Sequence, residues 1–273
     1  MFYWIRWSPD APELTDKHLI QYTYRCSRGS SLIRMKMADR ISTNRKEASA
    51  AQTDLDDLVV TIELTLISII QAVALTFLAD RSRDVLVNLE FAFFPYVVTG
   101  LLVILLFWSR SLIHTMTVIR WPLELGHNFM YFACTLVESV TFTQLTNALN
   151  WYALTALFGV MVWVLFTLDL RMIRRRIGDS AGPIGSKLYT IVELEQFLNI
   201  RFFMPATVAF NLLAVIALRL WPVFFTEGGG HAIIALVQLA AALGYLIYVM
   251  RFFTRIAPMV VKIRQEWREN VLP

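Results

Sequence analysis

The stretch from Trp121 to Gln144 carries the side chains best suited to chemistry. It is apolar and long enough to cross a bilayer as a helix, yet it contains two carboxylates and one histidine. At about 100° per residue, its polar and semi-polar side chains fall on one stripe roughly 100° wide. Ionisable groups at membrane depth are costly, so such a stripe is typical of a helix that faces a bundle interior or a water-filled path. The stripe consists of Glu124, His127, Asn128, Tyr131, Thr135 and Glu138.

Two interpretations of this stripe are open. Its side chains could line an aqueous path in which Glu124 and Glu138 set a preference for cations. His127 would then add pH sensitivity in the range where imidazole titrates. Alternatively, the polar groups bond to neighbouring helices and specify packing. We favour the path, because packing generally needs fewer polar groups than this stripe offers.

The apolar stretch 58–79 offers the best partner for the stripe. On a helical projection Thr61, Thr65 and Ser68 share one face, while Glu63 lies on the far side. We expect the hydroxyls to act as neutral cation ligands, and Glu63 to lie at a depth similar to that of His127. The alternative for the hydroxyl row is close packing of helices in lipid.

Composition places the chain in a membrane. Of its 273 residues, 57% are hydrophobic and only 17% are charged, whereas soluble domains are about a quarter charged. The net charge of +4 does not indicate a nucleic-acid partner, because the basic residues cluster beside apolar stretches. The only two cysteines make a disulfide framework or a thiolate metal site improbable.

The apolar stretches predict an all-α integral membrane bundle of six transmembrane helices. Basic residues cluster before the first stretch, after the fourth and after the sixth. The positive-inside rule then places both termini in the cytoplasm, with the protein in a plasma membrane or a bacterial inner membrane. The six stretches are 58–79, 91–108, 121–144, 151–170, 202–225 and 232–253.

The remaining polar segments complete the predicted organisation. The transmembrane domain covers 57–253, and it includes a cytoplasmic interfacial segment at 171–201, where Arg174, Arg175 and Arg176 could bind anionic lipid head groups or serve only as a topology signal. A cytoplasmic N-terminal segment, 1–56, precedes it, and residues 1–34 are interpreted as disordered or as an upstream extension. A cytoplasmic tail, 254–273, follows it.

Enzyme signatures find little support in this sequence. It contains no Walker A loop, dinucleotide-binding glycine pattern, nucleophile elbow or His-Glu-x-x-His motif. Glu124 and His127 have the Glu-x-x-His spacing of di-iron carboxylate bundles, but the second pair that such a site needs is missing. We therefore expect no enzymatic activity, no cofactor and no metal.

Together these patterns favour an oligomeric membrane ion channel that conducts cations. Its path would be lined by the third and the first apolar stretches, and a symmetric homo-oligomer would build an axial pore from repeated helices. Its partners would be membrane lipids, permeant ions and further copies of the chain. Two alternatives are a small-solute or proton-coupled secondary transporter and a non-conducting membrane scaffold or signalling partner.

Overall fold

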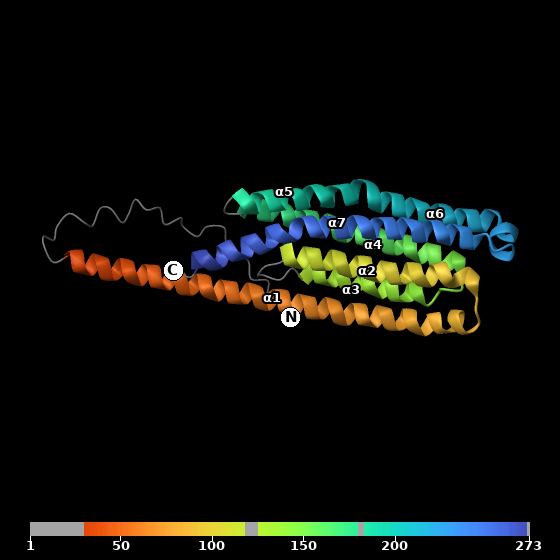
Figure 1. Cartoon of the computed structure of the whole chain (residues 1–273), viewed down its shortest axis with the longest axis horizontal. Coiled ribbons are helices and arrows are strands. Elements are labelled where there is room, and N and C mark those ends of the chain that lie inside the picture. Colours follow the sequence, from red (N-terminus) through yellow and green to blue (C-terminus); the bar gives the residue numbers. More distant parts are fainter. Residues whose placement is uncertain (1–29, 118–124, 180–182, 272–273) are drawn as a thin grey trace, which may run out of the picture. The chain divides into compact units, whose positions relative to one another are not determined.

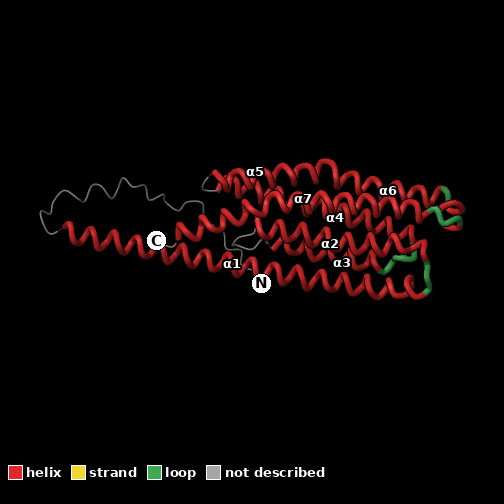
Figure 2. The backbone as a smooth tube through the Cα atoms, viewed as in Figure 1, coloured by secondary structure: helices red, strands yellow, loops and turns green. Residues whose placement is uncertain are grey.

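The structure is a computed structural model that describes residues 30–117, 125–179 and 183–271. Helices hold 94% of the described residues, and strands hold none of them. The predicted all-α class is therefore confirmed (Figure 1; Figure 2). The chain divides into two units, Met1–Ala51 and Gln52–Pro273.

Long helices joined by short connections make up the second unit. Contacts join α4 to α3, α5 and α6, and they join α7 to α2 and α5. The helices α4 and α7 therefore each pack against more than one neighbouring helix. Short 3-10 and π-helical turns lie at Phe91–Phe93, Asn199–Phe203 and Val223–Glu227. The α-helices of the described residues, of which α1 begins in the first unit, are α1 (Ser30–Val87), α2 (Phe94–Thr117), α3 (Leu125–Phe142), α4 (Ala148–Asp179), α5 (Pro183–Leu198), α6 (Met204–Leu220) and α7 (His231–Val271).

Five helical stretches among the described residues are long and apolar enough to cross a membrane. Many of their Leu, Ile, Val and Phe side chains are exposed, as expected for surfaces that meet lipid. The chain thus has the features of a multi-pass membrane protein. The helix α3 is not among the five, because its polar stripe lowers its mean hydropathy. The five stretches are Leu58–Val87, Phe91–Thr115, Ala148–Arg175, Lys187–Leu220 and His231–Ile263.

The helices α1 and α3 run side by side in the same direction. Asn128 near the start of α3 bonds to Glu63, and Glu138 near its end bonds to Gln71. Both partners lie inside the apolar part of α1. Therefore α3 packs alongside the apolar part of α1.

Two polar segments that flank the predicted apolar stretches are largely helical. The second predicted stretch ends at residue 108, but α2 stays helical to Thr117 and buries Arg110 and His114. The predicted interfacial segment 171–201 contains the end of α4 and all of α5, and α5 continues through a π-helical turn into α6. Arg110 of the first segment and Glu195 and Gln196 of the second are buried, and Arg110 bonds to both of them.

The π-helical turn Asn199–Phe203 changes which positions face inward. Glu195 and Asn199 are buried before the turn, and Met204 and Val208 are buried after it. An uninterrupted repeat of 3.6 residues from Asn199 would make positions near 203 and 206 face inward. The turn accommodates about one extra residue relative to a continuous α-helix. The inward-facing positions of α6 are therefore shifted by about one residue from those that the repeat of α5 would give.

Gly100 of α2 packs closely against side chains of α1 and α3. A Cβ atom added there would lie 2.8 Å from Leu78 Cδ1 and 3.2 Å from Phe142 Cε1. We expect Gly100→Val to lower the free energy of unfolding by about 1–3 kcal/mol, because the packed neighbours must shift. Equilibrium unfolding in detergent micelles measures this loss.

The matched control is Gly244→Val in α7. An added Cβ atom at Gly244 meets no other atom within 4 Å. The control should be neutral or stabilising, since it also removes a flexible glycine from a helix. Equal losses in the two variants would show that the close approach at Gly100 is unimportant.

Candidate functional site

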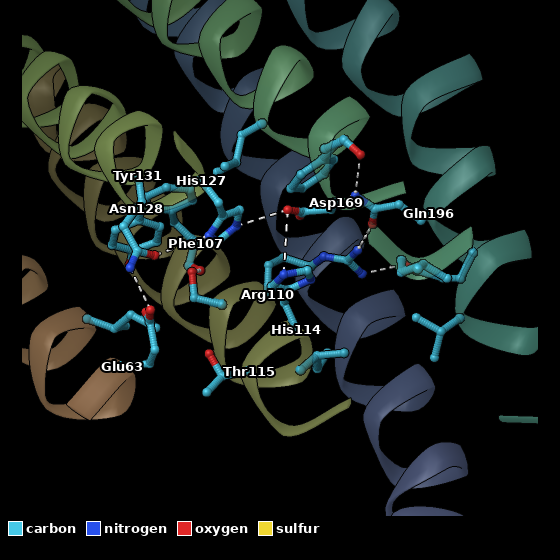
Figure 3. A pocket seen from close by; sticks show the side chains of 18 residues that line it. Glu63, Phe107, Arg110, His114, Thr115, His127, Asn128, Tyr131, Asp169 and Gln196 are labelled. Carbon is cyan, nitrogen blue, oxygen red and sulfur yellow. Dashed lines mark hydrogen bonds and ion pairs between the residues drawn. The ribbon is translucent and has the colours of Figure 1, made fainter. Parts of the chain in front are cut away.

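A cluster of buried charged and polar side chains lies where α1, α2, α3, α4 and α5 meet. At its centre is Asp169 of α4, which is 6% exposed. Its Oδ1 atom lies 2.9 Å from His127 Nε2 and 3.7 Å from His114 Nε2. The two imidazole rings stack with their centroids 4.8 Å apart (Figure 3). One carboxylate oxygen and two imidazole nitrogens therefore converge on one point.

Further polar contacts hold this centre in place. His127 Nδ1 lies 3.3 Å from Asn128 Oδ1, and Asn128 Nδ2 donates to Glu63 Oε1 at 2.6 Å. On the other side, Gln196 Nε2 lies 3.5 Å from Asp169 Oδ2 and donates to the Phe166 carbonyl at 3.0 Å. The side chain of Asp169 is thus approached from α3 and from α5.

Arg110 supplies the positive charge of the cluster. Its guanidinium bonds to Glu195 Oε1 at 2.5 Å and to Gln196 Oε1 at 2.6 Å. Glu195 Oε1 also accepts from Asn199 Nδ2 at 2.7 Å, and Asn199 Oδ1 accepts from the Tyr245 hydroxyl at 2.8 Å. A continuous series of contacts therefore runs from α1 to α7 through the interior. Figure 3 shows the part of this series between Glu63 and Gln196.

A second polar group lies nearer the end of α3. Gln71 Nε2 lies 3.2 Å from the Tyr131 hydroxyl and 3.4 Å from Glu138 Oε2. Glu138 is only 1% exposed. Its Oε1 atom has no hydrogen-bond partner among the described residues. Since Glu138 follows His127 by eleven residues, the two groups are separated by about 16 Å along the helix axis.

A small cavity of about 30 Å³ lies inside the first cluster. This is enough for one or two water molecules, and the polar lining offers them hydrogen-bond partners. Its polar lining includes Glu63, Arg110, His114, His127, Asn128, Tyr131 and Asp169.

The structure brings most of the predicted stripe together. Asn128 and His127 are partly buried, and Tyr131, Thr135 and Glu138 are buried. Thr135 donates to the carbonyl of Tyr131, 3.2 Å away, so its hydroxyl is used within the helix. The contacts of these stripe residues are therefore made within a single copy of the chain. The remaining member of the predicted stripe, Glu124, lies outside the described residues.

The hydroxyl row of α1 is placed apart from this cluster. Thr61, Thr65 and Ser68 are exposed, whereas Glu63 is 3% exposed. Thr65 and Ser68 each donate to a carbonyl one turn earlier in α1, at 2.8 Å. Glu63 is thus separated from the three hydroxyls with which it was expected to act.

The predicted lipid-binding arginines lie at the end of α4. Arg174 is exposed, and its Nε atom pairs with Glu193 Oε1 at 2.8 Å. Arg175 is exposed as well, and the side chain of Arg176 is outside the described part. Arg174 therefore forms an exposed ion pair with α5.

Sequence reasoning missed the centre of the site. Asp169, Arg110, His114 and Glu195 were not among the predicted site residues. A signal was present, since Asp169 is a lone carboxylate at the end of an apolar stretch and Arg110 and His114 are four residues apart. Residues at that spacing share a helix face, but only if the helix continues past residue 108.

The fold and the site together define an α-helical membrane protein with a buried ionic cluster. Comparisons with protein-family models, with curated proteins and with solved structures find no match for this chain. Its function must therefore be inferred from the cluster itself.

Proposed function

We propose that the protein moves cations across a membrane along a path inside each subunit. The path runs from Glu63, Asn128 and His127 to Tyr131 and Glu138. The observation that carries this proposal is that the polar stripe of α3 faces the interior of its own bundle, with two buried carboxylates along it. Ionisable groups at membrane depth mark ion or proton pathways by default.

The proposal includes six crossings and cytoplasmic termini. The sixth crossing is supported by the hydrogen bonds of α3 to Glu63 and Gln71, which both belong to an apolar stretch of α1. The basic clusters that flank the apolar stretches support the orientation. In this orientation Glu63 and His127 lie near the cytoplasmic side, and Glu138 lies closer to the outer side.

Flux from liposomes that contain the purified protein tests this function. Potassium, sodium, proton and chloride gradients are imposed separately. We expect flux of one or more cations and little chloride flux. Glu138→Gln should lower the cation flux at least about tenfold, because it removes the charge that offsets the dehydration of a cation along the path.

Thr65→Val on the exposed face of α1 is the matched control. If the path lies inside the bundle, this variant should conduct like the wild type. Normal flux in Glu138→Gln with loss in Thr65→Val would place the path between subunits instead, as in an axial pore. Absence of flux in every gradient, with folded protein, would favour the scaffold function.

A large apolar cavity favours secondary transport as a second candidate function. Its volume of about 650 Å³ is in the range of small-molecule sites. The cavity lies among α2, α4, α6 and α7. Arg110 and Tyr245 line this cavity, and both also form hydrogen bonds within the ionic cluster. Saturable uptake of a solute driven by a cation gradient would support this function.

Assembly into a homo-oligomer is a separate part of the proposal. A path inside each subunit does not require a partner copy. The mass of the detergent-solubilised particle, corrected for bound detergent, gives the number of copies. The permeation test above then determines whether the copies share a path.

A further inference from the structure

We propose that His114, His127 and Asp169 bind a divalent transition-metal ion. Their three donor atoms all lie within 4.8 Å of one another, and all three residues are shielded from solvent. The inference goes beyond the proposed transport function, because a protein that moves no cation could still hold a metal here.

The distances between the donors suit one ion. Zinc lies about 2.0–2.2 Å from imidazole nitrogens and carboxylate oxygens, so two donors on the same ion are about 3–4 Å apart. Asp169 Oδ1 lies 2.9 Å from His127 Nε2 and 3.7 Å from His114 Nε2. Small side-chain adjustments would place an ion between the three atoms.

The surroundings resemble the outer shell of a metal site. Metal-binding imidazoles generally use their second nitrogen in a hydrogen bond that fixes the ring. His127 does this through Nδ1 and Asn128 Oδ1, and Glu63 in turn orients Asn128. The adjoining cavity of about 30 Å³ has room for water to complete the coordination.

The charges of the cluster also favour a divalent cation. Arg110 and Glu195 cancel each other in a direct ion pair. Glu63 and Asp169 then leave two negative charges in a buried region, where uncompensated charge is costly. A single divalent ion balances both carboxylates.

The donor set indicates which metals fit. Two imidazoles and one carboxylate with open positions suit Zn²⁺ and Fe²⁺, whereas Mg²⁺ and Ca²⁺ prefer an all-oxygen set. Cobalt(II) is a useful probe, since its absorption spectrum reports the ligands and the geometry.

The test is Co²⁺ binding to the full chain in detergent after chelator treatment. We expect one Co²⁺ per chain at this site, with an absorption spectrum typical of nitrogen and oxygen ligands. Asp169→Asn should weaken binding by about 100-fold or more. Asn128→Leu keeps all three donors and should weaken binding about 10–100-fold by releasing His127.

His231→Gln is the matched control, because His231 lies against Tyr96 at the opposite end of the bundle. Its affinity for Co²⁺ should equal that of the wild type. If folded wild-type protein binds no Co²⁺, or if Asn128→Leu and Asp169→Asn both bind as tightly as the wild type, the proposal is overturned. The cluster would then be an ion pair only. Neither outcome depends on whether the protein conducts cations.

Discussion

Arg110→Leu is expected to lower the free energy of unfolding by about 3–5 kcal/mol. The substitution leaves Glu195 as a buried charge without its cation, and Gln196 loses the donor to its Oε1 atom. Removing one partner of a buried pair is costly because the remaining charge stays out of water. Equilibrium unfolding in mixed detergent micelles measures the change.

The control for this prediction is the exposed pair at the end of α4. Arg174→Leu breaks a pair with Glu193 in which the Arg174 side chain is 57% exposed. We expect a loss of less than about 1 kcal/mol, because solvent screens the remaining charge. A double variant, Arg110→Met with Glu195→Leu, should recover part of the first loss. Comparable losses for Arg110→Leu and Arg174→Leu would show that burial does not determine the cost of breaking an ion pair here.

Trp151→Ala is expected to cost about 3–5 kcal/mol by leaving a large cavity in the core. Trp151 is 1% exposed, and its ring packs edge-on against Tyr96 with centroids 5.4 Å apart. Its Nε1 atom donates to Gln238 Oε1 at 3.0 Å, and Gln238 donates to Asn211 at 2.9 Å. The substitution therefore removes both packing and the first donor of a chain that joins α4, α7 and α6.

Two further substitutions separate these contributions. Trp151→Phe keeps most of the ring but leaves Gln238 Oε1 without its donor, so a loss of about 1–3 kcal/mol is expected. Trp221→Ala removes a tryptophan that is 59% exposed after α6 and should have little effect. A loss in Trp221→Ala as large as that in Trp151→Ala would rule out burial as the cause.

The all-α class was predictable because apolar stretches of membrane length have few alternatives. In hydrocarbon every backbone amide needs a partner within the segment, so composition alone indicates helices. The inward face of α3 was predictable as well, since the spacing of Asn128, Tyr131 and Glu138 defines a face without reference to any neighbour. These parts depend only on local periodicity.

The centre of the site was not predictable because it depends on which helices touch. Nothing in the sequence near Asp169 indicates that His127 and His114 will reach it from two other helices. The hydroxyl row of α1 illustrates the same limit of sequence analysis. Its spacing correctly defines a face, but periodicity cannot indicate whether that face meets lipid or other helices.

The π-helical turn Asn199–Phe203 makes the length of this segment as important as its composition. Deleting one residue there would rotate α5 by about 100° relative to α6. Either the Arg110–Glu195 ion pair or the Gln238–Asn211 hydrogen bond would then be lost, because the rotated helix cannot face both partners at once. During evolution this segment should therefore accept many substitutions but few insertions or deletions, unless a second length change nearby restores the phase.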